Sequence, residues 1–263
     1  MPEHRSRMRI LITGYKGFIG QNMVKALSDH DLNLCEWGDE YSLYGIDRVI
    51  HLGAISDTRC DDWVALRKQN VGYSITLMER CQEYGIPIQL ASSASVYGPN
   101  NTTFKETDPV APANLYAESK ALIERYFHEM RPIAPVQIFR YFNVYGDHED
   151  HKGDQASPFH KFREQAKTGC IKIFEGSDQF KRDFIHVDEV IKTHKRFFKV
   201  QDSGIWNVGT GKTMSFEDVA HLASAEFPAK IETIPMPKDL VGYQKFTKAD
   251  VQKLQNTIKW SDK

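Results

Sequence analysis

The feature that most constrains the fold is a glycine-rich segment near the N-terminus. Gly14, Gly17 and Gly20 follow the spacing G-x-x-G-x-x-G, between an apolar run at 9–12 and an amphipathic stretch at 18–27. Glycines at this spacing let the backbone turn tightly and approach a pyrophosphate, which then lies at the positive N-terminus of the following helix. The segment therefore predicts a dinucleotide-binding loop between a first strand and a first helix.

The same alternation continues up to residue 145. Apolar runs stand at 32–35, 48–52, 86–91 and 136–139, with amphipathic stretches at 63–84 and 115–130. Strands that alternate with helices at this spacing form right-handed β-α-β units and a parallel sheet covered on both faces. We therefore predict an α/β fold of Rossmann type, a doubly wound parallel sheet, with residues 1–145 as its dinucleotide-binding domain.

Beyond residue 145 the pattern loosens. After a polar loop at 146–154 it indicates helices at 157–168, 187–198 and 216–227 and strand-like pieces at 171–174 and 205–208. We expect residues 146–263 to form mainly a smaller substrate-binding lobe, interleaved with the sheet and not joined to it by a linker.

Charge and hydropathy narrow the class of partner. The 34 Lys and Arg residues against 35 Asp and Glu residues give a net charge of −1, which provides no overall field for nucleic acid or an anionic membrane. The longest apolar runs fall far short of the ~20 residues that span a bilayer. Residues 1–7 are polar and precede no signal-peptide core, so a cytoplasmic protein is expected. Four well-separated cysteines suggest reduced thiols and no metal site.

One carboxylate is expected to influence the choice of cofactor. Glu36 follows the predicted strand at 32–35, about twenty residues after the glycines, where an acid usually holds the adenosine ribose. A carboxylate there accepts from a 2′-hydroxyl and repels a 2′-phosphate, which favours NAD. Lys16 inside the loop could instead meet a 2′-phosphate, so NADP stays open.

A serine, a tyrosine and a lysine form the predicted catalytic group. Ser93 follows the run at 86–91, at the carboxyl ends of the strands, and Tyr116 and Lys120 form a Tyr-x-x-x-Lys pair. Residues i and i+4 share one face of a helix, and a nearby cation favours the phenolate of a tyrosine that normally titrates near about 10. Tyr116 is therefore expected to be a general base near neutral pH, with Ser93 donating to the same substrate oxygen.

With these motifs the chain resembles the extended short-chain dehydrogenase/reductases that modify nucleotide sugars. The segments that carry the resemblance are the glycine loop, His51-Leu52-Gly53-Ala54, residues 92–98 and Tyr116-x-x-x-Lys120. A closer similarity to the ADP-heptose 6-epimerases rests on residues 139–146, 151–153, 174–177, 180–184 and 243–250. The resemblance covers nearly the whole chain.

The resemblance implies a role for individual residues. Tyr116 falls on the catalytic base, Ser93 on its hydrogen-bonding partner, Lys120 on the lysine beside that base and Lys152 on a second acid/base at the opposite side of the sugar. The implied dinucleotide contacts are Gly14, Gly17, Phe18, Ile19, Gly20, Glu36, Trp37, Leu52, Gly53, Ala54, Asn70, Tyr116, Lys120 and Val144. The implied substrate contacts are Ser93, Asn143, His160, Phe174, Glu175, Gly176, Ser177, Arg182 and Tyr243.

Two of these substrate contacts have a clear chemical purpose. Arg182 can bind a diphosphate with two parallel hydrogen bonds, and Tyr243 can close over the nucleotide. Trp37 can pack against the adenine. The family also implies a homo-oligomer, most simply a dimer formed through the helices at 63–84 and 115–130.

The expected reaction is inversion of a sugar carbinol, by oxidation to a ketone with tightly bound NAD or NADP and re-reduction on the other face. An ADP-heptose-like substrate is implied, and another nucleotide-sugar epimerase, such as a 4-epimerase, is an alternative. A one-base ketone reductase also stays open, because Lys152 could be a solvated lysine in a charged loop. Residues 93–95 contain no acid, which disfavours a 4,6-dehydratase. A non-catalytic nucleotide sensor would have lost Tyr116 or Lys120, and both are present.

The chain departs from the heptose epimerases in two places. The stretch between Glu36 and Arg48 is shorter than the family's loop, which carries basic residues for a 2′-phosphate. Asp154 stands where the family has a serine, two residues beyond the catalytic lysine. The first departure favours NAD, and the second leaves the substrate's identity open.

Overall fold

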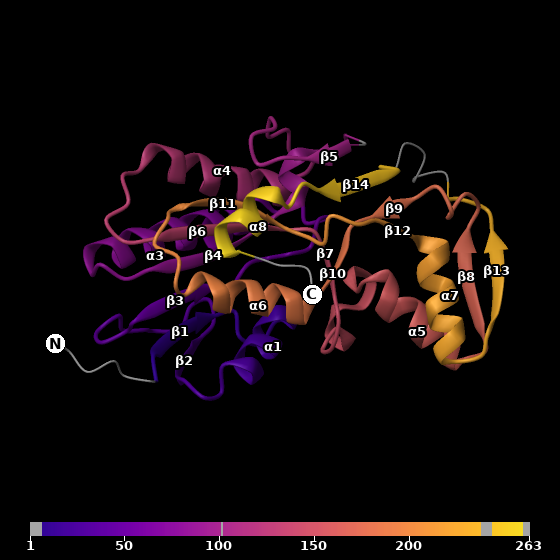
Figure 1. Ribbon diagram of the computed structural model, residues 1–263, viewed down its shortest axis with the longest axis horizontal. Coiled ribbons are helices and arrows are strands. Elements are labelled where there is room, and N and C mark those ends of the chain that lie inside the picture. The colour runs from indigo at the N-terminus through magenta and orange to yellow at the C-terminus, as the bar shows by residue number, and fades with distance from the viewer. Residues whose placement is uncertain (1–6, 101, 238–243, 260–263) are drawn as a thin grey trace.

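The computed structural model describes residues 7–100, 102–237 and 244–259. Its largest element is a parallel sheet with the strand order β11-β6-β4-β3-β1-β2 (Figure 1). The strands are β1 (Arg9–Thr13), β2 (Asp31–Cys35), β3 (Arg48–His51), β4 (Ile88–Ser93), β6 (Val136–Tyr141) and β11 (Gly204–Val208). The predicted doubly wound α/β fold of Rossmann type is confirmed.

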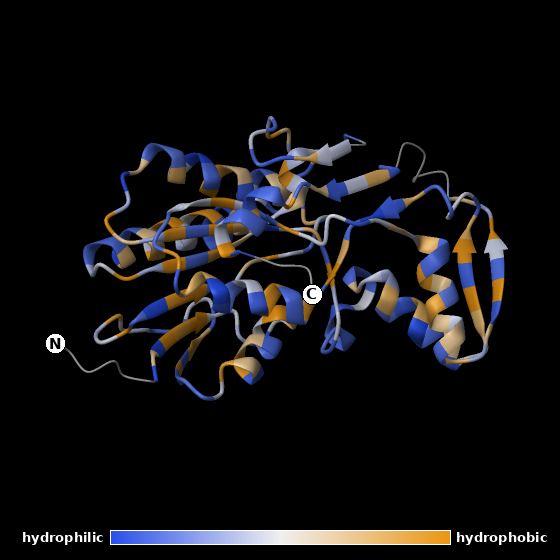
Figure 2. Ribbon diagram, in the orientation of Figure 1, coloured by the Kyte–Doolittle hydropathy of each residue, from blue (hydrophilic) through white to orange (hydrophobic). Residues whose placement is uncertain are grey.

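Helices cover both faces of this sheet. On one face, α1 (Phe18–Ala26) and α6 (Val187–Phe197) pack on a core that includes Ile10, Ile12 and Ile50. On the other face, α3 (Tyr73–Glu83) and α4 (Leu115–Glu129) pack on a core that includes Leu11 and Val49. Successive strand residues therefore point to opposite layers, and the central strands are orange along much of their length in Figure 2 because both of their faces are buried.

The stretch predicted as one helix at 63–84 is helical throughout but not uniform. It consists of α2 (Trp63–Leu66), a π-helical segment (Arg67–Gly72) and α3. The π-helical segment turns the carboxamide of Asn70 inward, and a π-bulge inside a helix frequently marks a functional site. A regular helical pattern gives no sign of the extra residue.

Strand β2 lies at the edge of the sheet. Residues 36–47 connect it to β3 without forming a helix or strand, so they add no strand beyond β2. Three of the five residues of β2 are exposed, whereas all four residues of β3 are buried.

The part beyond residue 145 divides between two environments. Helices α6 and α8 (Gln252–Ile258) and strand β11 belong to the layers of the large sheet. Strands β8 (Cys170–Phe174) and β13 (Lys230–Ile234) pair in parallel, and α5 (Pro158–Lys167) and α7 (Phe216–Glu226) pack beside them at the far end of the molecule (Figure 1).

Short elements join these two regions. A four-stranded sheet has the order β12-β9-β14-β5, and β10 pairs with β7. Their bounds are β5 (Thr102–Phe104), β7 (Asn143–Tyr145), β9 (Lys181–Arg182), β10 (Phe184–His186), β12 (Met214–Ser215) and β14 (Phe246–Ala249). Two 3₁₀-helices, Ala94–Tyr97 and Asp150–Gln155, follow β4 and β7, and the second lies in the predicted polar loop.

Two further properties concern the chain as a whole. Cys35, Cys60, Cys81 and Cys170 are free thiols, and two of them are buried. Within residues 7–100, 102–237 and 244–259, no helix is both long enough and apolar enough to cross a membrane.

Candidate active site

The glycine loop is tightly packed between β1 and α1. Gly14 has a φ of +73°, in the region that favours glycine, and a Cβ on it would overlap the backbone of Gly53. A Cβ on Gly20 would overlap the carbonyl of Gly14. These two glycines therefore allow the loop, the start of α1 and the segment after β3 to touch.

The start of α1 fits a dinucleotide pyrophosphate. Gly17 is the N-cap residue, it is exposed, and a Cβ on it would meet only the Gly14 carbonyl at 3.4 Å. No side chain caps the helix, and its first turn holds no acid. Uncapped amide groups and an open approach suit a bound anion, so this chain's residues fit the cofactor that the loop predicts.

Glu36 lies next to this loop. Its Oε1 accepts a hydrogen bond from the backbone N–H of Lys16 at 2.8 Å, and its own N–H donates to Asp39 Oδ2 at 2.8 Å. Trp37 is 45% exposed, with the ammonium of Lys68 5.4 Å from its ring centre. Glu36 and Trp37 are thus close to the position expected for the adenosine half of a dinucleotide.

Asn70, predicted as a cofactor contact, is bonded inside the chain. Its carboxamide accepts from the N–H of Ile55 at 2.8 Å and donates to the Ile55 carbonyl at 3.0 Å and to Ser119 Oγ at 3.0 Å. The side chain is completely buried. Asn70 therefore fixes the segment after β3, which includes Leu52, Gly53 and Ala54, to α4.

The predicted catalytic group comes together at the carboxyl end of β4. Ser93 ends this strand, and its Oγ accepts from Ser95 Oγ at 2.9 Å and hydrogen-bonds to the phenol of Tyr116. Tyr116 and Lys120 are both buried on one face of α4, which begins at the Asn114 N-cap. Lys120 Nζ lies 5.9 Å from the ring centre of Tyr116 and donates to the carbonyl of Ala91 at 2.8 Å.

The expected lowering of the Tyr116 pKa is wrong. Burial raises the pKa of Tyr116 above its usual value, and the hydrogen bond from Ser93 offsets only part of this increase. Burial also lowers the pKa of Lys120 to about 8, against the opposing effect of Glu124. Desolvation of the buried phenol is therefore the main influence on Tyr116, and the Lys120 ammonium is directed to the Ala91 carbonyl.

Lys152 lies beside the glycine loop, on a different segment from Ser93 and Tyr116. It lies in the 3₁₀-helix Asp150–Gln155, with Nζ 4.8 Å from the ring centre of Phe18, the first residue of α1. The same Nζ lies 3.5 Å from Oε2 of Glu149. The structure thus places Lys152 beside the glycine loop, together with Ile19 and Val144, which pack in the core under α1.

Glu149 organises the segment that carries Lys152. Its side chain is completely buried and accepts from Gly146 N at 3.1 Å, Ser157 N at 2.7 Å and Ser157 Oγ at 2.7 Å. The preceding residue, His148, has a φ of +72°, an uncommon value for a residue with a side chain. An uncommon backbone angle persists where surrounding contacts enforce it. Here the hydrogen bonds of the buried Glu149 carboxylate hold the backbone on both sides of His148.

The predicted substrate residues come from several segments, among them β7, α5 and the turn after β8. Asn143 Nδ2 donates to the Asp183 carbonyl at 3.0 Å, and His160 Nε2 lies 3.9 Å from an oxygen of Asp150. Ser177 Oγ donates to the Phe174 carbonyl at 2.6 Å, in the turn after β8 that also contains Glu175 and Gly176. Tyr243 lies outside the described residues.

Arg182 is less open than the diphosphate prediction requires. Only 4% of it is exposed, and its guanidinium donates to the carbonyls of Lys181 and Gln244 and lies 5.7 Å from the ring centre of Phe216. Arg182 thereby holds β9 to the chain before β14.

Two buried acids near the site were not predicted. Asp183 accepts from Thr210 N, Thr210 Oγ1, Gly211 N and Ala249 N, at 2.7 to 3.0 Å. Glu124, one turn after Lys120, accepts from Ser92 Oγ at 2.6 Å and forms a buried ion pair with Arg140 at 2.6 Å. The sequence signals for them are the i+4 spacing from Lys120 to Glu124 and the position of Asp183 in the segment 180–184.

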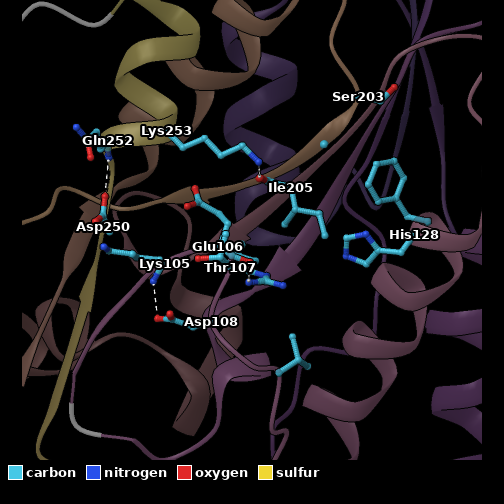
Figure 3. A pocket seen from close by; sticks show the side chains of 14 residues that line it. Lys105, Glu106, Thr107, Asp108, His128, Ser203, Ile205, Asp250, Gln252 and Lys253 are labelled. Carbon is cyan, nitrogen blue, oxygen red and sulfur yellow. Dashed lines mark hydrogen bonds between the residues drawn. The ribbon is translucent and has the colours of Figure 1, made fainter.

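A pocket of about 700 Å³ lies apart from this site (Figure 3). It lies between the end of α4, the loop at 105–110, the start of β11 and the start of α8. Lys253 crosses it to donate to the Ile205 carbonyl at 2.7 Å, and Lys105, Glu106 and Asp108 line another side (Figure 3). The glycine loop, Ser93 and Tyr116 are absent from its lining.

Known proteins match both the sequence and the fold. Residues 36–209 match the model of a family described as the NAD dependent epimerase/dehydratase family. ADP-L-glycero-D-manno-heptose-6-epimerase from Helicobacter pylori has a similar structure, with a TM-score of 0.84 and 21% identity over 98% of this chain and 92% of that one.

Two further solved structures are similar. UDP-N-acetylglucosamine 4-epimerase from Methanobrevibacter ruminantium M1 gives a TM-score of 0.85 and 25% identity, over 98% of this chain and 93% of that one. UDP-glucuronic acid 4-epimerase from Bacillus cereus, solved with NAD, gives a TM-score of 0.79 and 22% identity, over 97% of this chain and 93% of that one. The similarity extends over nearly the whole of each protein.

Proposed function

The chain belongs to the NAD dependent epimerase/dehydratase family, and from that premise we propose that it is a nucleotide-sugar epimerase that inverts a sugar carbinol through a ketone. The proposal is supported by two acid/base side chains that come from different segments of the chain. Tyr116, hydrogen-bonded to Ser93, comes from α4, and Lys152 comes from a separate segment beside the glycine loop. Two such groups suit a reaction that removes a proton on one face and returns it on the other.

NAD is the cofactor that the residues favour. Glu36 would accept from a ribose 2′-hydroxyl and repel a 2′-phosphate, and the short stretch 36–47 has no Lys or Arg. Gly14, Gly17, Gly20 and the uncapped start of α1 would hold the pyrophosphate. A bound NAD supplies the acceptor and donor of hydride for oxidation and re-reduction.

The chain's own residues would handle the proton. Tyr116 would exchange it with the sugar hydroxyl on one face and Lys152 on the other. Ser93 would donate to the same sugar oxygen, and Lys120, held by the Ala91 carbonyl, would tune the phenol and contact the cofactor ribose.

For the substrate we propose an ADP-heptose-like nucleotide sugar bound between the sheet and the smaller lobe, residues 146–263 in the main. The motifs at 139–146, 151–153 and 180–184 support it, as does the similar fold of the Helicobacter pylori enzyme. The 4-epimerase from Methanobrevibacter ruminantium, at 25% identity, supports a UDP-sugar as the second candidate.

The test is an NMR assay of the full-length protein on ADP-, GDP-, UDP- and dTDP-sugars. We expect inversion at one carbon with no net consumption of NAD(H), because the ketone is reduced by the hydride that it gave up. Turnover that requires stoichiometric NAD(P)H would replace this proposal with a one-base ketone reductase, in which Lys152 serves only as the partner of Glu149. Mass spectrometry of small molecules released on denaturation would identify a retained cofactor or sugar nucleotide.

We also propose a homodimer formed through the helices at 63–84 and 115–130. Val64 and Leu115 are exposed apolar residues on these helices, at 77% and 37% exposure. Light scattering should give about twice the 30.2 kDa chain mass at micromolar concentration. A single species of the chain mass would contradict it.

A further inference from the structure

Two segments that each contact the glycine loop are joined to one another by an ion pair. Arg59, in the segment after β3, places Nη1 3.6 Å from Oδ2 of Asp154, in the 3₁₀-helix that carries Lys152. The Arg59 segment touches the loop where Gly53 packs against Gly14, and the Asp154 segment touches it where Lys152 covers the ring of Phe18. With the glycine loop they form a closed ring of contacts, from Gly14 through Gly53, Arg59, Asp154 and Lys152 to Phe18.

Hydrogen bonds hold the backbone segments that carry Arg59 and Asp154 in place. Asp57 Oδ1 accepts from the N–H of Arg59 at 2.8 Å and from its Nε at 3.4 Å, and the buried Asn70 anchors this segment through Ile55. On the other side, the Asp154 carbonyl accepts from Lys161 Nζ at 2.7 Å.

The Asp154 segment is also anchored at its beginning and shaped within. Glu149 is buried and bonded to Gly146 and Ser157, which fixes both ends of the segment. Gly153, immediately before Asp154, has a φ of +49°, which breaks the helical path and is tolerated best by glycine. Asp154 is therefore directed toward Arg59 by the shape of the backbone.

We propose that Arg59 and Asp154 are positioning residues that fasten the Lys152 segment over a bound dinucleotide and slow its release. The proposal rests on the dinucleotide site of the proposed function. A dinucleotide whose pyrophosphate lies at the start of α1 would be enclosed by the ring of contacts and could leave only after the ion pair opened. Asp154, the residue that departs from the heptose epimerases, thereby gains a role in cofactor retention and not in substrate recognition.

The effect should be modest. The side chains of Arg59 and Asp154 are 62% and 83% exposed, and exposed ion pairs are weak and screened by salt. Loss of one such pair corresponds to about a two- to fivefold faster dissociation. An ion pair of this strength slows cofactor release but still opens to allow it.

The test measures the dissociation rate of NADH from the full-length protein, by fluorescence during a chase with excess NAD. R59Q and D154N should each release NADH about two to five times faster than the unsubstituted protein. The double variant R59Q/D154N should be no faster than R59Q, because D154N removes no further contact once Arg59 is gone. D150N is the control: it removes another exposed acid from the same 3₁₀-helix, 90% exposed against 83% for Asp154, and should leave the rate unchanged.

Salt provides a second readout. Raising NaCl from about 0.05 to about 0.5 M should accelerate release from the unsubstituted protein more than from the double variant, since only the former has a pair to screen. The proposed role of the Arg59–Asp154 pair would be overturned if D154N released NADH at the same rate as the unsubstituted protein, or if D154N and D150N changed that rate equally. Either result would leave the proposed function intact. Failure of the unsubstituted protein to bind NADH would overturn both.

Discussion

Lys120 donates a hydrogen bond from its ammonium to the carbonyl of Ala91 at 2.8 Å, so a buried cation lies beneath the end of β4. Only 4% of Lys120 is exposed. Burial lowers its pKa from 10.5 to about 8, which means that the folded chain binds this proton less tightly than the unfolded chain. The buried charge should therefore lower the free energy of unfolding below pH 8, and this loss of stability should disappear as the pH rises toward 10.5.

Replacing Lys120 by methionine should make the cofactor-free protein more stable and less active. Methionine keeps the length of the side chain but removes the buried charge, so the free energy of unfolding at pH 7 should rise by about 1–3 kcal/mol. Urea unfolding would measure this gain, which should shrink between pH 8 and 10. Lys172→Met, at an exposed position on β8, is the control and should show no such gain. A less stable K120M protein at pH 7 would contradict the prediction.

Removal of either proposed base should affect the chemical step. Tyr116→Phe and Lys152→Met should each lower kcat by about 10²- to 10⁴-fold, the range typical of positioned acid/base groups, while NAD binding survives. NMR of the inverted carbon measures kcat, and calorimetry measures NAD binding. Lys167→Met, which removes an exposed lysine at the end of α5, serves as the control. Full activity in the Lys152→Met variant would leave Tyr116 as the only base.

Glu36 should give NAD at least the affinity of NADP. Calorimetric titration of the cofactor-free protein with each nucleotide measures the difference. Glu36→Gln should reduce the difference in affinity between NAD and NADP, because the amide no longer repels a 2′-phosphate. The hydrogen bond from the Lys16 N–H can still form to the amide oxygen. A tenfold preference for NADP, about 1.4 kcal/mol, would instead assign the 2′-phosphate to Lys16.

Two buried histidines should make the fold sensitive to acid. Burial lowers the pKa of His51 and of His194 to about 3, and both rings are hydrogen-bonded, His51 to Thr13 and Ser74 and His194 to Tyr141 and Gln89. The unfolded chain binds these protons near pH 6.5 and the folded chain does not. Stability should therefore fall as the pH drops from 6.5 toward 3, by about 1.4 kcal/mol per pH unit for each histidine.

Proton NMR can check the two histidines directly. Their ring protons should not titrate between pH 5 and 7.5 in the folded protein. In urea unfolding, His194→Gln should reduce the slope of stability against pH by the contribution of one histidine. A ring proton of His194 that shifts near pH 6.5 would show that the ring ionises in the folded chain.

Local patterns predicted the parts of the site that depend on local geometry. Gly14, Gly17 and Gly20, and the helical pair Tyr116 and Lys120, lie where their spacing indicated, because a tight turn and a helix face are properties of neighbouring residues. The protonation of Tyr116 was predicted wrongly because the spacing i, i+4 does not reveal how deeply the pair is buried or that Ala91 takes the ammonium.

Contacts between distant residues were not predictable in this way. Arg59 and Asp154 are 95 positions apart, and Asp183 gathers donors from Thr210 and Ala249. Each pairing depends on how the β-α-β units and the later segments come together in space, and one sequence contains no local signal for it. The Arg182 guanidinium was expected to bind a diphosphate, but it donates to backbone carbonyls instead. The motif at 180–184 does not indicate this packing.

The short connection between β2 and β3 has a consequence for how copies of the molecule behave in a crowded solution. A strand at the border of a sheet can recruit a strand from a neighbouring molecule, and repeated recruitment leads to aggregates. Asp39 and Glu40 are exposed just after β2, whereas Asp31 on the strand is paired with Arg9, so two such borders that approach each other bring acids of the same charge together. Electrostatic repulsion at this border should therefore oppose the growth of fibres, and a high salt concentration should weaken that protection.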